Sequence, residues 1–435
     1  AADARKLRSL RTTVSRAVAT AAGTPPGPVH LNVPLRKPLE PTPVDGSVPD
    51  DFEVPDRDGP YVSVSTGAPA PPESAIRKVA AALDDAERPL LVCGPADGPT
   101  PDGDALRALA DATGAPLLAD PLSGHRFGDL DACGGYDAYL DEHVTAAWPD
   151  PDVVLRFGAS PTSKTLRSYL ARTEPRQFLV DPAGEWREAT FTATDLVAAD
   201  ETAFARAVAD RAESPGESAW RDRFRDAEQA HWRLVADAEP SMEGSILSAV
   251  ASEAPDPATL FVSNSMPVRD LDRFGAPRDA DLSVLGNRGV SGIDGITSTA
   301  LGAGSSTDDP LVLVTGDLAY YHDMNGLLAL ARCDVAATVV LINNDGGGIF
   351  HMLPVEDFEP PFTDQFRTPH GLDFEATEAL YDLDFERVAP EDFAARFAAV
   401  VGEGTTVIEV QTEAESSHRA REALLERLHT SLADE

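Results

Sequence analysis

Cysteine and lysine are both scarce in this chain, and each shortage excludes a class of protein. The three cysteines, Cys93, Cys133 and Cys333, are odd in number and widely spaced, which excludes a disulfide framework or a zinc knuckle. They are most simply explained as small buried apolar residues. Only four lysines occur, so arginine supplies the other 32 of the 36 basic residues.

Long apolar runs are also missing. The longest mainly apolar stretch, Val335–Ile342, is far shorter than the roughly 20 residues that a membrane-spanning helix needs. The N-terminus, which begins Ala1-Ala2-Asp3-Ala4-Arg5-Lys6, has no apolar signal core. We therefore expect a soluble cytoplasmic protein. Hydrophobic residues still make up 42% of the 435 residues, enough for real cores, so wholesale disorder is excluded.

Acidic residues are abundant instead. There are 73 of them against 36 basic residues, a formal net charge of −37, and they are spread along the whole chain. A surface this acidic repels nucleic acid and anionic lipid, so neither is an expected partner. Acid-rich, lysine-poor surfaces are typical of proteins that must stay hydrated in concentrated salt. We therefore expect this protein to work in a salt-rich cytoplasm. An ordinary acidic protein from an organism with arginine-rich coding is the alternative.

Helical patterns alternate with short apolar runs over most of the chain. The first such region includes strand-like runs at Leu90–Cys93 and Val153–Phe157. After Glu213–Glu217, a second region repeats the alternation with longer runs, including Leu311–Val314 and Val339–Ile342. This alternation predicts an α/β fold with successive doubly wound, mostly parallel sheets.

The opening of the chain is organised differently. Leu7, Leu10, Val14 and Val18 form a helical stripe, and Val29–Val33 is expected to be a short buried strand. One helix and one strand cannot bury a core alone, so we expect this opening to be the last part of a domain. Residues 41 to 72 are rich in Pro, Asp, Gly and Ser and are expected to form an extended linker.

The most informative stretch runs from Pro310 to Pro354. One predicted strand delivers Gly316-Asp317-Leu318 at its carboxyl end, and the next delivers Asn343-Asn344-Asp345-Gly346-Gly347-Gly348. In an open parallel sheet, ligands bind beyond the carboxyl ends of the strands, and helix N-termini favour phosphate. The sequence therefore predicts a phosphate-binding site at this edge.

These residue types also suit a divalent cation held against a diphosphate. Magnesium prefers oxygen ligands, often one or two carboxylates plus phosphate oxygens and water. Asp317 and Asn344 can each give a side-chain oxygen, and Gly346 can give its carbonyl. A Gly-Asp turn followed at this distance by paired asparagines resembles the thiamine diphosphate motif, with Mg²⁺ (or Mn²⁺) as the bound ion.

Longer blocks narrow the resemblance. They are Asn264–Asp270, Gly286–Gly295 and Asn343–Pro354, with looser support from Pro28–Pro34, Leu118–Ser123 and Gly371–Phe374. Together they resemble the 2-succinyl-5-enolpyruvyl-6-hydroxy-3-cyclohexene-1-carboxylate (SEPHCHC) synthases, the MenD family of menaquinone biosynthesis. The resemblance implies the fold of thiamine diphosphate-dependent decarboxylases. It also implies decarboxylation of 2-oxoglutarate on thiamine diphosphate and addition of the resulting succinic semialdehyde carbanion to isochorismate, giving SEPHCHC and CO₂.

The family also implies a domain division. We expect residues 1–45 to be the end of a pyrimidine-binding domain, 46–73 a linker, 74–212 a central domain and 213–435 the diphosphate-binding domain. On this interpretation most of the first domain is missing, together with the glutamate that activates the cofactor, and the chain alone is expected to be inactive. In this superfamily the cofactor lies between subunits, which implies a homodimer or homotetramer.

Site residues follow from the same blocks. Arg269 and Arg288 match arginines that bind substrate carboxylates, for which the planar guanidinium group is well suited. Lys164 resembles a basic position that approaches isochorismate, although the second basic residue that can follow it is Thr165 here. Ser265 matches a residue close to the cofactor. The cofactor-binding loops are expected to include Gly316, Leu318 and Gly347, and an apolar wall is expected from Ile293, Ile349, Phe350 and Leu353. For each of these residues an ordinary surface, turn or core role is the alternative.

Two other functions remain open at this point. An acetolactate-synthase-like enzyme would keep the cofactor but act on a small neutral donor, and such relatives usually have Gly-Asp-Gly where this chain has Gly316-Asp317-Leu318. The other possibility is a catalytically silent protein that retains the fold.

Overall fold

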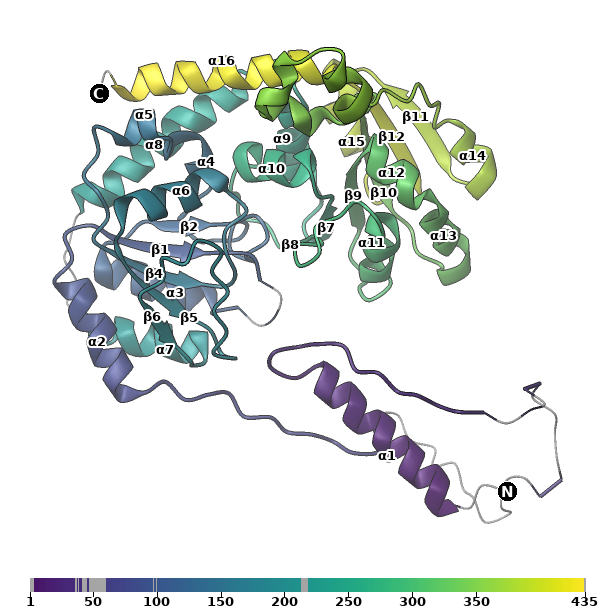
Figure 1. The fold of residues 1–435 in the computed structure, drawn as a ribbon, viewed down its shortest axis with the longest axis horizontal. Helices are drawn as coiled ribbons and strands as arrows, with labels where there is room; N and C mark the ends of the chain where they lie inside the picture. Colours follow the sequence, from purple (N-terminus) through teal and green to yellow (C-terminus); the bar gives the residue numbers. More distant parts are fainter. Residues whose placement is uncertain are drawn as a thin grey trace.

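The computed structural model describes residues 4–35, 37, 39–40, 45–46, 60–96, 98, 100–212 and 218–433. Within these ranges, the chain forms two separate six-stranded sheets in which every paired strand is parallel. Helices cover the sheets, as Figure 1 shows. The predicted fold class, successive parallel α/β sheets, is confirmed.

The first sheet has the strand order β3-β2-β1-β4-β5-β6. Its strands are β1 (Pro89–Cys93), β2 (Leu117–Ala119), β3 (Ala132–Cys133), β4 (Val153–Phe157), β5 (Arg176–Val180) and β6 (Asp195–Val197). Its helices are α2 (Glu73–Asp84), α3 (Gly103–Thr113), α4 (Tyr136–Tyr139), α5 (Glu142–Thr145), α6 (Lys164–Thr173), α7 (Glu201–Ala209) and α8 (Ala219–Ala236). The central strands β1 and β4 are buried along their whole length, because helices cover both faces of the sheet.

The second sheet has the order β11-β12-β10-β9-β7-β8. Its strands are β7 (Ala258–Val262), β8 (Leu282–Leu285), β9 (Leu311–Gly316), β10 (Thr338–Asn343), β11 (Asp384–Val388) and β12 (Thr406–Gln411). Its α-helices are α9 (Glu243–Glu253), α10 (Met266–Phe274), α11 (Ile296–Gly304), α12 (Asp317–Asp323), α13 (Leu328–Cys333), α14 (Ala376–Tyr381), α15 (Phe393–Val400) and α16 (Ala414–Ala433). Short turns of 3-10 helix are η1 (Met324–Leu327), η2 (Gly348–Met352), η3 (Pro354–Asp357) and η5 (Pro390–Asp392), and η4 (Thr363–Arg367) is a π-helical turn.

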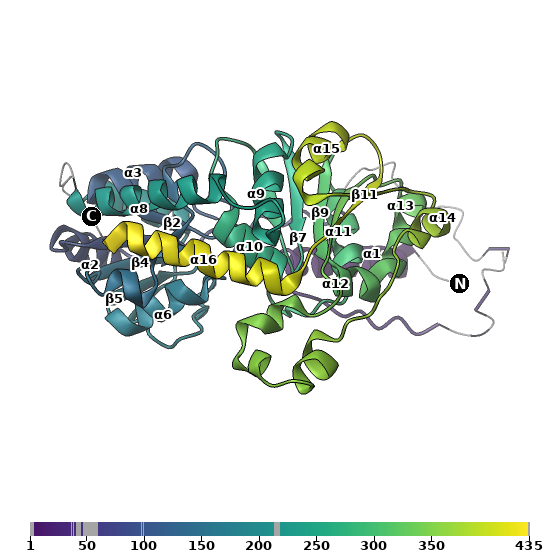
Figure 2. The same ribbon diagram turned by 90° about the horizontal axis from the view of Figure 1, so that it is seen from above.

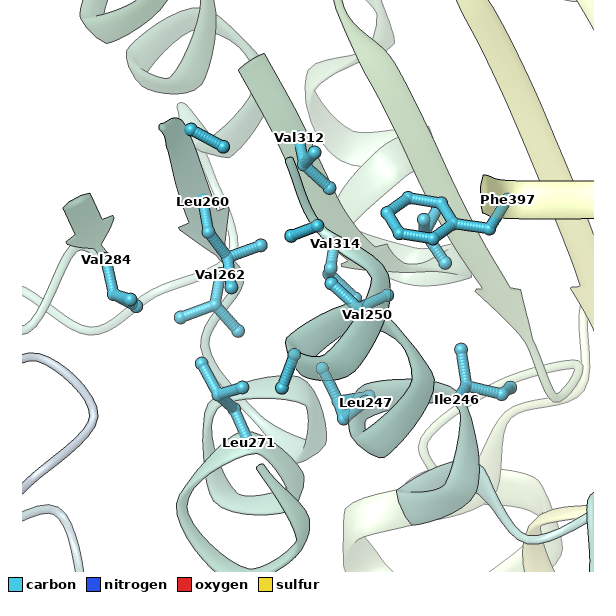
Figure 3. Packing of buried hydrophobic residues seen from close by; sticks show 14 of the residues in the cluster. Ile246, Leu247, Val250, Leu260, Val262, Leu271, Val284, Val312, Val314 and Phe397 are labelled. Atoms are coloured by element: carbon cyan, nitrogen blue, oxygen red, sulfur yellow. The ribbon is translucent and has the colours of Figure 1, made fainter. Parts of the chain in front are cut away.

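The core of the second sheet lies under α9, α10 and α15. Leu247 and Val250 of α9 point toward Val312 and Val314 of β9, while Phe397 of α15 approaches from the β10 side (Figure 3). All of these side chains are almost completely buried. This packing fixes the carboxyl ends of β7, β9 and β10 relative to one another.

Helix α16 ties the two sheets together. It runs from the second sheet across to the first, which Figure 2 shows from above. Its Leu428 belongs to the same buried cluster as Trp220 and Phe224 of α8 and Leu90 of β1. The expected boundary at residue 213 assigns α8 to the diphosphate-binding domain, whereas α8 packs on the first sheet. Residues 213–217 lie outside the described residues. The boundary therefore stays a prediction.

The helix of the N-terminal segment lies apart from both sheets (Figure 1), whereas the turn that follows it, at residues 24–26, lines a cavity at the end of β1. Helix α1 (Ala4–Ala21) forms as the apolar stripe predicts, but none of its residues is buried. The expected strand at Val29–Val33 is wrong: these residues form no strand, and Val33 is 59% exposed. An apolar run without a neighbouring strand has no partner for its backbone groups, so the local pattern alone is insufficient. Residues 41–44 and 47–59 of the expected linker region lie outside the described residues.

Candidate cofactor and substrate site

A cavity of about 180 Å³ lies where the strand order of the second sheet reverses. From β7 the chain continues to β8 on one side, and from β9 it continues to β10 on the other, so the carboxyl ends of β7 and β9 form a topological switch point. The cavity is lined mainly by residues at or after the carboxyl ends of β7, β8, β9 and β10, including ten of the predicted site residues: Ser265, Ile293, Gly316, Asp317, Leu318, Asn344, Gly346, Gly347, Ile349 and Phe350. The structure thus brings together residues from four separated stretches of the sequence.

Asp317 is the buried carboxylate of this cavity. Its Oδ2 accepts hydrogen bonds from the backbone N–H groups of Asn344 (3.2 Å) and Gly346 (3.0 Å), and its Oδ1 accepts one from Leu318 (2.6 Å). Burial raises the pKa of Asp317, and the bonds from Gly346 and Leu318 offset part of that increase. These bonds join the β9 and β10 ends directly.

Asn344 is held by a glutamate that the sequence analysis does not identify. Its Nδ2 donates to Oε1 of Glu243 (2.8 Å), which also accepts from the Thr412 hydroxyl (3.1 Å). Glu243 lies in the first turn of α9 and is 4% exposed. Because the amide nitrogen faces Glu243, the amide oxygen faces the other way. That Oδ1 atom is buried and has no hydrogen-bond partner among the described residues.

The two asparagines therefore have different roles. Asn343 turns away from the cavity: its Nδ2 donates to Oε1 of Glu409 (2.7 Å) and its Oδ1 accepts from the Asp345 N–H (3.1 Å). Of the pair, Asn344 is the one whose oxygen lacks a partner within the described chain.

Glycine is required at position 346. Its φ is +137°, and a Cβ there would lie 2.1 Å from the carbonyl oxygen of Arg367. At Gly348, a Cβ would lie 2.6 Å from Nδ2 of Asn344. Any side chain would therefore displace the loop or the asparagine, which explains the glycine run.

These groups suit a divalent cation. A buried polar atom without a partner is costly, and the Asn344 oxygen would gain one from a bound ion. Asp317 supplies a carboxylate beside it, and the Gly346 carbonyl, which accepts the Gly348 N–H (3.1 Å), has a second lone pair to offer. In the described part of the chain no three His, Cys, Asp or Glu side chains cluster as metal ligands, so an ion here would also need oxygens from a ligand such as a diphosphate.

His370 supports the same carboxylate. Its Nδ1 accepts the Leu372 N–H (3.0 Å), so its proton lies on Nε2, which donates to Oδ2 of Asp317 (3.2 Å). The sequence gives little signal for this role, because His370 lies 53 residues beyond Asp317. His351, which lies nearer to the cofactor loops in sequence, pairs instead with Glu356 (2.8 Å).

Ser265 occupies a strained turn at the end of β7. Its φ is +69° and its ψ −125°, outside the regions that non-glycine residues favour. Such strain costs on the order of 1–3 kcal/mol and is commonly found at functional sites. The turn also starts α10, where Arg269 lies one turn further on.

Arg269 and Arg288 lie outside the cavity lining but beside it. Arg269 Nη1 donates to the carbonyl oxygen of Ser265 (2.5 Å), and Arg288 Nη1 donates to Oδ1 of Asn264 (2.8 Å). Burial lowers the pKa of both, and the charge of Arg288 lowers that of Arg269 further, so the two guanidinium groups are neighbours.

The remaining predicted residues are more peripheral. Lys164 is exposed at the start of α6 and lines a second cleft of about 410 Å³ together with Arg269. Leu353 is 46% exposed and does not line the cavity. The roles of all these residues stay predictions.

Comparison with known proteins agrees with this geometry. A family model described as the middle domain of thiamine pyrophosphate matches residues 85–262, and one described as the C-terminal TPP binding domain of thiamine pyrophosphate enzymes matches residues 279–410. No helix in the described ranges has the length and apolar character needed to cross a membrane.

Several curated relatives match nearly the whole chain, and each is named 2-succinyl-5-enolpyruvyl-6-hydroxy-3-cyclohexene-1-carboxylate synthase. The protein from Haloarcula marismortui is 59% identical over 452 residues, covering 99% of this chain and 76% of the relative. The proteins from Natronomonas pharaonis (60% identity; 98% and 75% covered) and Haloquadratum walsbyi (54%; 99% and 77%) are similar. The chain therefore belongs to the SEPHCHC synthase family of thiamine diphosphate-dependent enzymes.

Proposed function

We propose that this protein is a SEPHCHC synthase, a transferase that decarboxylates 2-oxoglutarate and adds the remaining four-carbon unit to isochorismate, releasing CO₂. The observation that carries the proposal is the arrangement of Asp317, Asn344 and Gly346 at the switch point, with the buried Asn344 oxygen unpartnered among the described residues. Thiamine diphosphate, when bound, supplies the thiazolium carbon that attacks the 2-oxo acid and the ring that accepts the electron pair when CO₂ leaves.

The chain's own residues would bind and position the reactants. Asp317, Asn344 and the Gly346 carbonyl would hold Mg²⁺ or Mn²⁺, which would neutralise the diphosphate. Ile293, Ile349 and Phe350 line the same cavity and would exclude water from the reacting atoms.

Arg269 and Arg288 would bind the carboxylates of the two substrates. Both are fixed in place by hydrogen bonds that leave other guanidinium N–H groups available. Asn264, which accepts from Arg288, itself donates to the carbonyl oxygens of Asn287 (2.8 Å) and Gly292 (2.9 Å). This pre-organisation favours dicarboxylates over a small neutral donor such as pyruvate.

The domain bounds, the oligomeric state and the cellular location are proposed together with the function. We retain 1–45 as pyrimidine-domain remnant, 46–73 as linker, 74–212 as central domain and 213–435 as diphosphate-binding domain. A homodimer or homotetramer in a salt-rich cytoplasm is supported by the cofactor arrangement of the superfamily and by the 73 acidic residues against only 36 basic ones.

The direct test is turnover. The chain together with a complete pyrimidine-binding domain, supplied with thiamine diphosphate and Mg²⁺, is expected to consume 2-oxoglutarate and isochorismate in equal amounts, releasing one CO₂ per product molecule identified by mass spectrometry. Pyruvate should not replace 2-oxoglutarate. Efficient use of pyruvate with no use of 2-oxoglutarate would favour the acetolactate-synthase-like alternative and contradict the proposal.

A further inference from the structure

Arginines in the interior of this protein are usually paired with carboxylates. Arg126 pairs with Asp272 (3.0 Å), Arg156 with Glu188 (3.6 Å), and Arg421 with Asp270. Carboxylates are plentiful in a chain with 73 acidic residues, so the pairing is expected. A half-buried arginine without a carboxylate is therefore an exception that needs a physical explanation.

Arg278 and Arg367 are also half-buried without an ion pair among the described residues, but three other such arginines occur together. Arg167, Arg269 and Arg288 are each half-buried, and none forms an ion pair with any residue that the structure describes. Their side chains donate instead to neutral oxygens: Arg167 Nη1 donates to the carbonyl oxygen of Pro161 (2.7 Å), while the other two contact Ser265 and Asn264.

The three guanidinium groups also influence one another. After burial, the next largest influence lowering the pKa of Arg269 is the charge of Arg288, followed by that of Arg167. The pKa of Arg288 is lowered by burial; the carboxylate of Asp120 opposes this decrease, Arg167 adds to it to a smaller extent, and Asp272 also opposes it. Like charges held together at reduced solvent exposure repel, and a bound anion would relieve that repulsion.

Two of the four acidic residues that line the cleft shared by Arg167 and Arg269 are paired with other arginines. In the cleft that Arg167 and Arg269 share, Asp137 pairs with Arg273 and Asp272 pairs with Arg126. Asp141 accepts the His143 N–H at the start of α5 (3.0 Å), and Glu142 is exposed. The cleft therefore retains a group of cations suited to an anionic ligand.

Arg167 reaches this cleft from the first sheet, whereas the cofactor cavity lies at the strand ends of the second sheet. It belongs to α6 of the first sheet, one helical turn after Lys164, whereas Arg269 belongs to α10, whose first residue follows Ser265 of the cofactor cavity. The donor substrate must reach the cofactor first. A ligand that touches Arg167 is therefore the acceptor, which extends outward from the cofactor.

We propose that Arg167 binds a carboxylate of the acceptor dicarboxylate, isochorismate, and with Arg269 and Arg288 forms a three-arginine site shared by both sheets. The inference rests on the proposed function and deepens it. It also explains how a chain with Thr165 after Lys164 still presents a second cation from α6, one turn along the same helix.

The test is calorimetric titration of isochorismate into the protein saturated with thiamine diphosphate and Mg²⁺, without 2-oxoglutarate, so that no turnover occurs. Arg167→Gln keeps an N–H donor for the Pro161 carbonyl but removes the charge, and it is expected to weaken isochorismate binding at least tenfold. Arg167→Lys, which keeps the charge but not the planar fork, should recover part of that loss. Arg233→Ala, which removes one exposed positive charge on α8, is the matched control and should bind normally.

Steady-state kinetics then distinguishes a defect in isochorismate binding from a defect in binding the donor substrate or the cofactor. In steady-state turnover, Arg167→Gln should raise the Michaelis constant for isochorismate at least tenfold, while the Michaelis constant for the donor substrate and the affinity for thiamine diphosphate change less than twofold. Normal isochorismate binding by Arg167→Gln, or a weakening confined to the donor substrate, would overturn the assignment of Arg167. Failure of the unaltered protein, tested with a complete pyrimidine-binding domain, to bind isochorismate or form product would instead contradict the proposed function.

Discussion

At the scale of single residues, Glu243 determines which atom Asn344 presents to the cavity. It accepts from the amide nitrogen of Asn344 (2.8 Å) and from Thr412 (3.1 Å), and its own N–H donates to Oγ of Ser417 (3.0 Å). Groups of this kind orient metal ligands without touching the metal.

Glu243→Ala is expected to weaken Mg²⁺ binding by roughly 10- to 100-fold, because the Asn344 amide loses the acceptor that fixes its orientation. The Mg²⁺ concentration that supports half-maximal thiamine diphosphate binding measures this effect. Glu253→Ala, at the exposed end of the same helix, is the control. An unchanged Mg²⁺ midpoint in Glu243→Ala would show that the glutamate has only a structural role.

The sequence reveals only part of this site. Asp317 and Asn344 are recognisable because a glycine-rich motif at the ends of two buried strands has few other uses. Glu243 is not, because it lies 101 residues before Asn344 and is one glutamate among many at helix starts. His370 and Arg167 escape detection for the same reason: their roles depend on tertiary contacts rather than on local spacing.

At the scale of elements, α15 packs into the same buried cluster as α9 and as β7 and β9, the strands whose ends form the switch point. Phe397 is completely buried, stacks on Phe393 (ring centroids 5.6 Å apart) and packs on the side of the sheet that α9 covers (Figure 3). Phe397→Ala is expected to lower the free energy of unfolding by about 3–5 kcal/mol, through lost burial and the cavity left behind. Urea denaturation measures this loss.

Ala398→Ser changes a neighbouring exposed position of the same helix and should alter the unfolding free energy by less than about 0.5 kcal/mol. Equal stability of the two variants would contradict the packing described here.

Helix α7 carries a buried acid in its first turn. Burial raises the pKa of Glu201 from 4.5 to about 7, and nearby Asp181 adds to the increase. Between these pH values the unfolded chain has released a proton that the folded protein retains, so stability should fall as pH rises from about 4.5 to 7 and then level off.

Glu201→Gln removes this titration. It is expected to stabilise the protein at pH 8 by on the order of 1–3 kcal/mol, with the difference vanishing below pH 4.5, where the glutamate is protonated in both states. Thermal unfolding over this pH range, with the exposed Glu426→Gln as control, gives the comparison. A constant difference between Glu201→Gln and the unaltered protein at every pH would contradict this account.

Strands are predicted correctly from the sequence where their residues are buried on both faces of the sheet. The long apolar strands β9 and β10 are predicted correctly because central parallel strands are buried on both faces. Edge strands such as β8 and β11 are missed, since their half-exposed residues give no continuous apolar run. The sequence between β9 and β10 favours a single helix from Ala319 to about Arg332, but η1 divides this segment into α12 and α13, an interruption that the apolar pattern does not show.

At the scale of the whole molecule, alternation of helices and strands is enough to predict two parallel sheets, but it does not place them relative to each other. Their relative position depends on α16 and α8, which pack together on the first sheet, and on pairs such as Arg126 with Asp272. The cleft that we propose to bind isochorismate lies at this junction, because Lys164 and Arg167 come from the first sheet and Arg269 from the second.

The central claim is that the ends of β7, β9 and β10 bind thiamine diphosphate through a divalent cation. Calorimetric titration of thiamine diphosphate, with Mg²⁺ and again with a chelator, tests it most directly in the unaltered protein and in Asp317→Asn. Asp334→Asn, at an exposed left-handed position that asparagine tolerates, is the control. We predict that Mg²⁺ strengthens binding at least tenfold in the unaltered protein and in the control but not in Asp317→Asn. Equal affinity with and without Mg²⁺, or a normal Mg²⁺ response in Asp317→Asn, would contradict the account.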